Sequence, residues 1–593
     1  MFENPFLVRN QEIEWSSGKP FSKIFNDRYF QDAALDEIEN VFIQPNLLRE
    51  KFKTQEHILV GELGFGLGVN FLYTLRVWIE CKQSPSKYFE YISIEKYLPT
   101  KAQIIQAASL FPELAEVSEI FLRYYNPIHN GILKIYLKEI NASLIIINTD
   151  IQDAFDLIQN NHGRITAWFL DGFDPKKNPE MWASKIIMAL KQCSKSNASF
   201  GTYTSSGLVK KSFNENNIEF KKIDGFNKRH KLVGSIQNNS NTSHLPTPKK
   251  IAVIGAGIAA AAVVHALKKQ GLTCDLFEKS YRLHSGASGN DAAAMYPKFQ
   301  LNNSPINRFL VQSYFFSYQE MLQFKDSFYP CNAWFFGSNE RTNKWIEAVK
   351  SNERFSLFQE IKEDIVAPYN ELIKTKAEFL SGAFLEPKKI IEEIFESSAT
   401  NIYFNHELIS LEKKSDETIL TFKNGDSQAY DAVILALGSG LRDWVKELQI
   451  SKGHIIGIPV EYVHEIKHPI HHQGYILPKL GSYHWTGSTY EHDYKNLDSS
   501  PEQINQILKE NAIFLKTREI PFDEILVRVS ERVSRKNKFP IATRLFKNQN
   551  VFALGGLGSR GFSSSFLCGE VVANLVTNGF IPVDYEVQKN LEI

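Results

Sequence analysis

The sequence contains few cysteines and no long apolar run. Its five cysteines lie far apart and form no CxxC pair: Cys81, Cys193, Cys274, Cys331 and Cys568. Their spacing argues against a zinc knuckle or a disulfide framework and fits a reducing cytoplasm. No apolar run reaches membrane-spanning length, and the N-terminus lacks a basic and apolar signal segment. We therefore expect a cytoplasmic protein without a membrane partner and without a bound metal.

An excess of charge of one sign is also absent. The 67 Lys and Arg residues balance 67 Asp and Glu residues, which gives a formal net charge of +0. No global field therefore attracts nucleic acid, and any RNA contact must come from local basic clusters such as 210–211, 221–222, 228–231 and 532–538. Hydrophobic residues make up 43% of the 593 positions, which describes an ordinary globular protein too long for a single core.

A polar, proline-bearing stretch over residues 237–248 lacks periodicity and is predicted to be a linker. Before it, short apolar runs alternate with helical segments, which indicates a doubly wound, mostly parallel sheet in a first domain over 1–236. After it, a second domain over 249–593 begins at once with a strand and a helix. A long region of mixed strands and helices follows, and a strand, a loop and a helix over 551–577 end the domain.

The first glycine-rich loop follows the apolar run Ile58–Val60 and contains Glu62, Gly64, Gly66 and Gly68. An acid at the strand end distinguishes it from a dinucleotide-binding loop, in which backbone amides hold a pyrophosphate. Such a loop suits S-adenosylmethionine, whose amino acid and ribose need no phosphate site. Glu95, which ends the next apolar run, is expected to accept the ribose hydroxyls, and Asp150 is expected near the adenine. The alternative is a glycine-rich turn that binds nothing.

Asp171 follows the apolar run Ala167–Leu170, at the strand end where open sheets bind ligands. Methyl transfer to an amine needs a neutral nitrogen in line with the methyl carbon, and a carboxylate can accept the N–H proton and orient the lone pair. We expect Asp171 to do this; the alternative is a helix N-cap. Phe173 and Trp182 could stack on a base. For Trp168 and Trp182 a core position and a site position stay equally open.

The second glycine-rich loop follows Ile251–Ile254 and is closed by Glu278, 23 positions after its first glycine. Its small residues are Gly255, Gly257 and Ala260. Three later segments fit an FAD enzyme better than a protein that binds NAD alone. They are a small-residue loop with Ser288 and Gly289, an apolar strand that ends at Gly438, and a loop before a late helix with Gly556, Ser559 and Gly561.

Four motifs together resemble the MnmC family of bifunctional tRNA wobble-uridine modification enzymes: Gly61–Gly68, Asp171–Trp182, Thr202–Gly207 and Gly225–Lys231. The resemblance covers nearly the whole chain in the same domain order. It implies an α/β protein with a Rossmann-like S-adenosylmethionine methyltransferase domain, followed by an FAD-binding α/β domain that carries an inserted mixed α+β substrate domain. It also implies tRNA as the substrate, and we expect a monomer.

The family reaction implies an order of steps. FAD-dependent removal of the carboxymethyl group from 5-carboxymethylaminomethyl-(2-thio)uridine leaves 5-aminomethyl-(2-thio)uridine, and methylation of that amine gives 5-methylaminomethyl-(2-thio)uridine. Because the amine exists only once the carboxymethyl group has gone, the second domain acts first. A carboxymethyl arm needs a cation, and Arg560, Arg532 and Lys298 are the candidates. A solvated surface position is an open alternative for Lys298 and Arg535.

Two rival functions remain. One is an amine or amino-acid oxidase for small molecules fused to an N-methyltransferase; the other is a tRNA-binding or flavin-sensing protein with one decayed domain. A metalloprotease is disfavoured, although His464–His468 spells HExxH, because Pro469 opposes the helix that zinc binding by this motif requires. His471 and His472 are expected to be an exposed pair in a loop.

Overall fold

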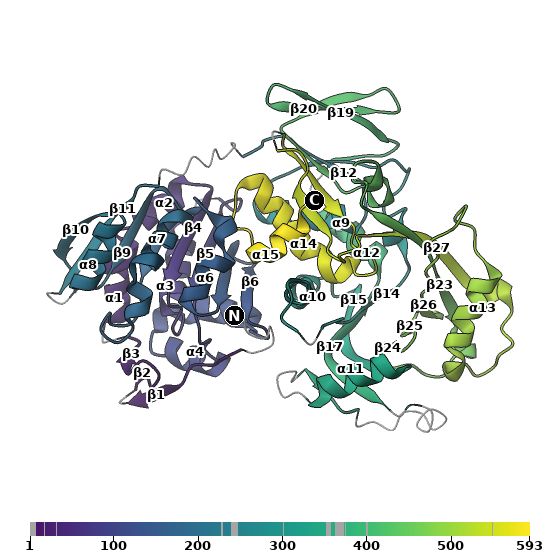
Figure 1. Ribbon diagram of the computed structural model, residues 1–593, viewed down its shortest axis with the longest axis horizontal. Coiled ribbons are helices and arrows are strands. Elements are labelled where there is room, and N and C mark those ends of the chain that lie inside the picture. Colours follow the sequence, from purple (N-terminus) through teal and green to yellow (C-terminus); the bar gives the residue numbers. More distant parts are fainter. Residues whose placement is uncertain are drawn as a thin grey trace. The chain divides into compact units, whose positions relative to one another are not determined.

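The computed structural model describes residues 8–16, 18–30, 33–82, 84–226, 229–238, 247–300, 302–351, 357–361, 373, 375–398, 401–547 and 549–593. Most of the predicted linker and two residues of the fourth motif, Asn227 and Lys228, lie outside this part of the chain. The chain divides into two compact units (Figure 1). The first unit contains residues 1–247, 267–272 and 573–589, and the second contains 248–266, 273–572 and 590–593. The boundaries at 236 and 249 remain a prediction.

The first unit is built on one eight-stranded sheet (Figure 1). In spatial order its strands are β10 (Glu219–Asp224), β11 (His230–Ile236), β9 (Ser194–Thr202), β8 (Ile165–Leu170), β4 (His57–Leu63), β5 (Tyr88–Ile94), β7 (Ala142–Asn148) and β6 (Gly131–Leu137). The central strands from β9 to β7 run parallel. β5 and β7 are buried along their whole length, as parallel strands with covered faces require.

Helices cover both faces of this sheet and form a core on each. Side chains alternate along β4, so that Val60 joins one core and Leu63 the other. The core with Val60 contains side chains of α2 (Leu48–Thr54), α3 (Val69–Cys81), α4 (Lys101–Ala108) and α5 (Ala115–Tyr124). The core with Leu63 contains those of α6 (Ile151–Leu157), α7 (Ser184–Cys193) and α8 (Gly207–Glu215). The remaining elements are α1 (Ala34–Ile38) and a small sheet of β1 (Ile13–Ser16), β2 (Lys19–Ser22) and β3 (Asp27–Arg28).

Trp168 and Trp182 are both core residues. Each is almost fully buried among the side chains that pack with Leu63. The indole nitrogen of Trp168 donates to Oγ of Ser194 at 2.8 Å, and that of Trp182 donates to the carbonyl of Phe173 at 3.1 Å. Buried indoles usually find such partners. Of the core position and the site position that the sequence left open, both tryptophans therefore take the core position.

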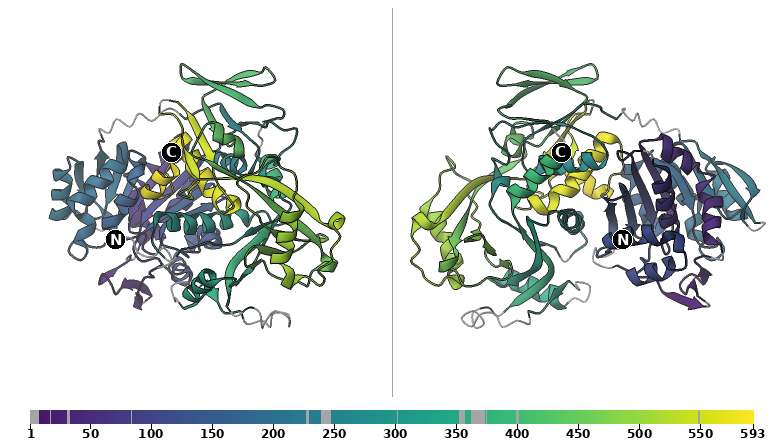
Figure 2. Two further views of the ribbon diagram at one scale, coloured as in Figure 1. Left: turned by 45° about the vertical axis from the view of Figure 1, so that its right-hand side comes forward. Right: turned by 180° about the vertical axis from the view of Figure 1, so that it is seen from behind.

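The second unit contains a six-stranded sheet with the strand order β18 (Asn401–Tyr403), β13 (Asp275–Phe277), β12 (Ile251–Ile254), β22 (Ala432–Leu435), β29 (Val551–Gly555) and β28 (Ile541–Arg544). All neighbours are parallel except β28 and β29. A three-stranded sheet of β19 (Leu408–Lys414), β20 (Glu417–Phe422) and β21 (Ser427–Tyr430) projects from the rest of this unit (Figure 2).

A larger mixed sheet is inserted between these parallel strands. Its path is β14 (Ala293–Met295), β17 (Lys376–Leu385), β15 (Phe328–Phe336), β24 (Ile470–His471), β25 (Tyr475–Leu480), β26 (Tyr483–Gly487), β23 (Gln449–Pro459) and β27 (Leu526–Ser534), and β16 (Phe358–Gln359) pairs with β17. The helices after the linker are α9 (Ile258–Lys269), α10 (Pro305–Met321), α11 (Glu340–Ser351), α12 (Pro387–Ser397), α13 (Pro501–Glu510), α14 (Gly561–Thr577) and α15 (Tyr585–Leu591). No helix among the described residues is long and apolar enough to cross a membrane.

One ion pair is completely buried in the first sheet. Nζ of Lys134 lies 2.9 Å from Oε1 of Glu90, and neither side chain is exposed. His57 contacts the other carboxylate oxygen at 3.0 Å. Burial alone would raise the pKa of Glu90, but Lys134 and His57 outweigh it and lower the pKa to about 2. Glu90 is therefore an ionised carboxylate whose stability inside the sheet depends on its partners.

We expect Lys134→Met to destabilise the first unit by about 3–5 kcal/mol, because it leaves a buried carboxylate with one cation fewer. Amide hydrogen exchange in β5 and β7 measures the loss locally. Lys138→Met, at an exposed position after β6, is the control and should stay within about 0.5 kcal/mol of the wild type. Equal protection in the two variants would contradict the expectation.

Candidate active sites

The first candidate site lies at the carboxyl end of β4. The chain runs outward from β4 to β5 and β7 on one side and to β8 and β9 on the other, which makes β4 the topological switch point of the sheet. Open α/β sheets bind ligands at such points. In the ladder Leu63 pairs with Ile94 and with Leu170. The residues that follow these three strands are therefore brought together, as the sequence predicted.

The glycine loop needs backbone conformations that favour glycine. Gly64, Gly66 and Gly68 have φ values of +90°, +53° and +78°, and α3 begins at the next residue. The amide of Gly66 donates to Oε2 of Glu95 at 3.0 Å, and the amide of Tyr97 donates to Oε1 at 2.9 Å. Glu95 thus closes the loop from the neighbouring strand. The backbone amides of Phe65 and Lys96 also face this carboxylate, so the ribose contact predicted for Glu95 stays a prediction.

Glu62 and Asp171 are joined by one amide nitrogen. Nδ2 of Asn70 lies 2.9 Å from Oε1 of Glu62 and 2.6 Å from Oδ2 of Asp171. Oγ of Ser93 donates to Oε2 of Glu62 at 2.7 Å. No helix begins at Asp171: the next helical turn starts at Pro179 and has Asn178 at its N-cap position. The alternative of an N-cap aspartate is therefore wrong.

These acids lie in a place that disfavours negative charge. Burial raises the pKa of Glu62 to about 7 and that of Glu95 to about 7. Burial also raises the pKa of Asp171 well above its usual range, and the nearby Glu62 and Glu37 add to that shift. A bound cation would relieve this repulsion. The donor and acceptor set therefore fits a sulfonium or an ammonium group.

Asp150 has partners in the protein for both carboxylate oxygens. Its Oδ1 caps α6 by accepting from the amide of Gln152 at 3.0 Å, and its Oδ2 lies 2.8 Å from Nζ of Lys96. Burial alone would raise its pKa, but Lys96 and the helix amide outweigh burial and lower the pKa. Asp150 is thus an ionised N-cap two residues beyond β7. The adenine contact predicted for it stays a prediction.

Aromatic side chains border this site, and two of them, Phe25 and Tyr29, lie outside the motifs. The ring of Phe173 stacks on Phe25 with centroids 4.7 Å apart and meets Tyr29 edge-on at 5.5 Å. The hydroxyl of Tyr203 donates to the carbonyl of Gly172 at 2.8 Å. Phe25 and Tyr29 come from the small N-terminal sheet and the chain just after it, far in sequence from any glycine loop. Local patterns therefore give no signal for them.

The second candidate site lies at the carboxyl end of β12, between β13 and β22. Gly255 has a φ of +108°, and a Cβ there would collide with the carbonyl of Ala436, just beyond β22. A Cβ at Gly257 would lie 3.0 Å from Oγ of Ser288, which accepts from the amide of Ile258 at 3.0 Å. Ala260 is fully buried, as the close packing of helix on strand requires.

Glu278 closes this loop as Glu95 closes the first. It is buried and accepts from the amides of Ala256 and Ser280, both at 2.9 Å. Gly289 leaves room for the guanidinium of Arg528, whose Nη2 donates to the carbonyl of Gly286 at 2.7 Å. Arg528 belongs to none of the motifs that the sequence shows. The loop amides and the N-terminus of α9 suit a pyrophosphate, so this edge fits the nucleotide part of FAD.

The other predicted FAD-binding residues follow β22 and β29, at the same edge of the sheet. Gly438, after β22, has a φ of +58°. Gly556 and Gly558, after β29, have φ values of +68° and +58°. Ser559 is exposed, and Gly561 is the first residue of α14. A helix N-terminus here favours negative charge nearby.

Lys298 and Arg560 interact with both Tyr296 and Tyr490, and Arg532 packs on Tyr490. The Arg532 guanidinium lies 4.8 Å from the ring centroid of Tyr490, and Nζ of Lys298 lies 5.4 Å from that of Tyr296. Nη1 of Arg532 also donates to the carbonyl of Thr489 at 2.9 Å. The structure therefore brings together the three cations that the sequence proposed for a carboxylate.

The charges of this cluster affect one another. Tyr296 is the main cause of a raised pKa at Lys298, which stays accessible to solvent although tyrosines and Arg560 surround it. Burial lowers the pKa of Arg560. Burial alone would raise the pKa of Tyr490, but Arg532 and its other neighbours lower it. An anion that entered here would meet several cations at once.

Several expectations about cations and histidines need correction. Lys231 and Arg535, expected as phosphate contacts or surface cations, are buried. Nζ of Lys231 donates to Oδ1 of Asn40 at 2.8 Å, and Arg535 donates to two carbonyls of the C-terminal segment, both at 2.8 Å. His471 is also buried rather than exposed, because β24 places its ring against Tyr296 and Phe335.

The HExxH segment does not have the geometry that zinc binding by this motif requires. The segment 464–468 is not helical, so the two histidines of the HExxH spelling do not share a helix face. The part of the chain that the structure describes holds no group of three or more His, Cys, Asp or Glu side chains arranged for a metal. Lys221 and Lys222 are exposed on the edge strand β10.

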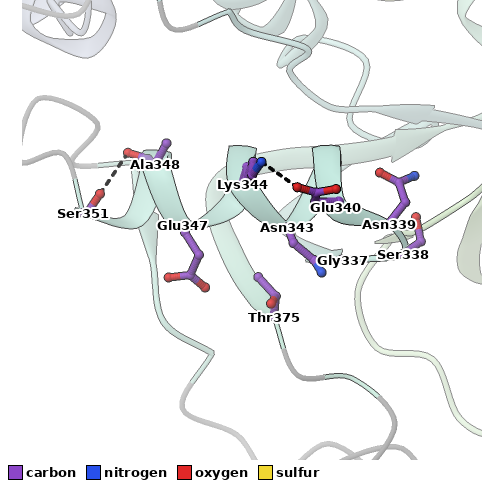
Figure 3. Close-up of a pocket in the computed structure, with 10 residues that line it drawn as sticks. All are labelled: Gly337, Ser338, Asn339, Glu340, Asn343, Lys344, Glu347, Ala348, Ser351 and Thr375. Carbon is purple, nitrogen blue, oxygen red and sulfur yellow. Dashed lines mark hydrogen bonds and ion pairs between the residues drawn. The ribbon is translucent and has the colours of Figure 1, made fainter.

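The second unit also has a surface pocket, whose lining residues Figure 3 shows. It is lined mainly by the first three turns of α11, among them Glu340, Lys344 and Glu347. Lys344 and Glu340 pair with each other at 2.6 Å. No predicted site residue lines this pocket, and neither glycine loop opens onto it. It therefore takes no part in either candidate site.

A family model described as FAD dependent oxidoreductase matches residues 250–575, more than half of the chain. The chain belongs to this family. A second model, described as S-adenosyl-L-methionine-dependent methyltransferase, matches residues 112–237 of the same chain. This range includes Asp150 and Asp171. The two matches confirm the predicted fold class and domain order, and they imply S-adenosylmethionine and FAD as cofactors.

Curated relatives confirm the resemblance that the four motifs indicated. The tRNA 5-methylaminomethyl-2-thiouridine biosynthesis bifunctional protein MnmC of Idiomarina loihiensis is 27% identical, over 98% of this chain and 99% of the relative. The protein of that name from Aliivibrio fischeri is 27% identical, over 98% and 96%. Among solved structures, a glycine oxidase from Geobacillus kaustophilus aligns with a TM-score of 0.47 and 17% identity, over 56% of this chain and 95% of that one.

We expect Glu278→Ala to weaken FAD binding by about 10- to 100-fold, because a charged acceptor is worth about 1.5–3 kcal/mol. The flavin absorbance retained after dialysis measures the effect. Glu320→Ala is the matched control, since Glu320 is also buried but lies on α10 and contacts His265 at 2.7 Å. Equal flavin content in both variants would count against the role of Glu278.

Proposed function

We propose that this chain modifies the wobble uridine of tRNA in two steps. FAD-dependent removal of the carboxymethyl group from 5-carboxymethylaminomethyl-(2-thio)uridine is followed by S-adenosylmethionine-dependent N-methylation of the resulting 5-aminomethyl-(2-thio)uridine. The observation that carries the proposal is the alignment with the MnmC proteins over 98% of this chain. It is supported by the charges of the two candidate sites, which suit the two forms of one side arm.

We assign the first step to residues 249–593. Glu278, Gly255, Gly257 and the N-terminus of α9 would hold the nucleotide part of FAD, and Gly438, Gly556, Ser559 and Gly561 would border its flavin end. When bound, FAD supplies a two-electron acceptor for the C–H bond beside the amine. Arg532, Arg560 and Lys298 would hold the carboxylate of the arm, since guanidinium groups bind carboxylates through two hydrogen bonds.

We assign the second step to residues 1–236. The amides of the glycine loop and Glu95 would hold S-adenosylmethionine, which when bound supplies an electrophilic methyl carbon whose bond to sulfur breaks as the amine nitrogen bonds to it. Asp171 would accept an N–H hydrogen bond from the amine, keep its lone pair directed at the methyl carbon, and take the proton that the nitrogen loses. Phe173 lies beside this position and offers a face for the uracil ring.

The setting of the enzyme completes the proposal. We propose that it works as a monomer in the cytoplasm, without a metal, on a tRNA whose anticodon loop presents the uridine. Exposed lysines on the edge strand β10, Lys221 and Lys222, suit the RNA backbone, because phosphate contacts are made by accessible cations.

Nucleoside mass analysis of tRNA tests the function directly. Treated with this chain, tRNA that carries the carboxymethylaminomethyl group should yield the methylaminomethyl nucleoside when S-adenosylmethionine is present and the aminomethyl nucleoside when it is not. Asp171→Asn should accumulate the aminomethyl nucleoside in both cases, because its amide cannot take a proton. Rapid oxidation of free glycine or sarcosine, with no change in the tRNA, would contradict the proposal.

Arg532→Met tests the carboxylate contact. We expect it to raise KM for the carboxymethylaminomethyl tRNA by about 10- to 100-fold, because a charge-assisted contact is worth about 1.5–3 kcal/mol. Flavin content should stay normal. Arg544→Met is the matched control, since this guanidinium packs 4.9 Å from the ring centroid of Phe552. A KM that is the same in both variants and the wild type would exclude Arg532 as the carboxylate contact.

A further inference from the structure

Asn70 occupies a position that no motif identified. It is the second residue of α3, immediately after the glycine loop, and its carbonyl accepts from Oγ1 of Thr74 at 2.7 Å. Its single amide nitrogen faces two acids that arrive from different strands, Glu62 on β4 and Asp171 after β8. An amide nitrogen has two hydrogens, so Asn70 can donate one to each carboxylate.

The two carboxylates of Glu62 and Asp171 accept different numbers of hydrogen bonds from the protein. Both oxygens of Glu62 accept from the protein, one from Asn70 and the other from Ser93. Asp171 accepts from Asn70 at Oδ2 only. Among the residues that the structure describes, no protein group donates to Oδ1 of Asp171. Glu62 is therefore held inside the protein, and Asp171 keeps one oxygen available for a ligand.

We propose that Asn70 is a positioning residue for methyl transfer, which orients Asp171 so that Oδ1 meets the substrate amine and which keeps Glu62 from competing for that amine. This inference rests on the proposed methylation of an aminomethyl group. In the transfer step the neutral amine nitrogen would form a bond to the methyl carbon as the carbon–sulfur bond breaks, and the proton that the nitrogen loses would go to Oδ1 of Asp171. Asn70 exchanges no proton, since its nitrogen stays a donor throughout.

The charges around Asp171 explain why a neutral donor is needed. Glu62 and Glu37 face it as acids, and Tyr91 and Tyr203 face it as phenols. A cationic donor would neutralise Asp171 as an acceptor for an ammonium group, whereas an apolar side chain would leave two acids facing each other. The Asn70 hydrogen bond lowers the pKa of Asp171 against these raising effects. Without Asn70 the carboxyl group would hold its proton to a higher pH and fail to accept another.

The decisive experiment measures methylation of aminomethyl tRNA against pH for the full chain and its Asn70→Leu variant. Asp171 must be ionised to take the proton, so the acid limb of kcat/KM should move upward by about one pH unit, which is tenfold at a fixed pH on that limb. Activity should recover toward the wild-type level at higher pH. Asn70→Ser, which keeps one donor, should show a smaller shift.

Asn148→Ala is the matched control. Asn148 is buried at the same edge of the sheet, but its amide donates to the carbonyls of Glu95 and Lys96, at 2.8 and 3.1 Å, and to neither acid. Its acid limb should stay at the wild-type pH. A uniform loss of activity at every pH in Asn70→Leu, or an unshifted acid limb, would overturn the inference.

Calorimetry of S-adenosylmethionine binding gives a readout that needs no turnover. Titrations in buffers of different ionisation enthalpy report the protons released when the sulfonium binds. Near neutral pH Asn70→Leu should release more protons than the wild type, because more of its acid pair is protonated beforehand. Binding also shows that the first unit is folded, and Asn70→Ser decides the question if the leucine variant does not bind. A wild-type chain that fails to methylate the tRNA would refute the proposed function, whereas equal proton release with normal methylation would refute only the role of Asn70.

Discussion

Both candidate sites depend on a strand that has parallel neighbours on each side. β4 lies between β5 and β8, and β12 lies between β13 and β22, so three carboxyl ends meet at one edge in each unit. At each edge a glycine loop leaves the central strand, and an acid from a neighbouring strand accepts its amides: Glu95 in the first unit and Glu278 in the second. The sheet therefore holds each loop against its acid by direct hydrogen bonds, and the cofactor is expected beside this pair.

Around this shared framework the two units place opposite charges. Next to the first loop, Glu62 and Asp171 share a neutral donor, and burial makes them hold protons more strongly than free acids do. In the second unit, Arg532, Arg560 and Lys298 surround two phenols. A buried site favours ligands whose charge is opposite to that of its own side chains, because an uncompensated charge is costly away from water. The first site thus suits cations and the second suits anions.

The sequence predicts the parts of each site that follow a local rule. A glycine after one apolar run and an acid at the end of the next apolar run can be recognised along the chain, so Gly64, Glu95, Gly255 and Glu278 could be found by inspection. Asn70, Phe25 and Tyr490 obey no such rule, since each becomes relevant only through a partner far away in sequence. The burial of Lys231, Arg535 and His471 could not be foreseen either. Each has a polar residue directly beside it in the sequence, and only the pairing of distant strands and the return of the C-terminal segment enclose them.

If the chain has the proposed function, opposite charges in the two sites also give the reaction a direction. Before the first step the side arm of the uridine carries a carboxylate, which the cations of the second unit attract and the acids of the first unit repel. Removal of the carboxymethyl group leaves a primary amine that is mostly protonated near neutral pH. The same arm is then repelled where it was made and attracted to Asp171. An arm that loses its carboxylate and keeps an ammonium group would thus bind less favourably beside the cations of the second unit and more favourably beside the acids of the first. Asp171 takes the proton that the nitrogen loses on methylation, so the product amine is neutral as it forms and the charge that held the arm in the acidic site is gone.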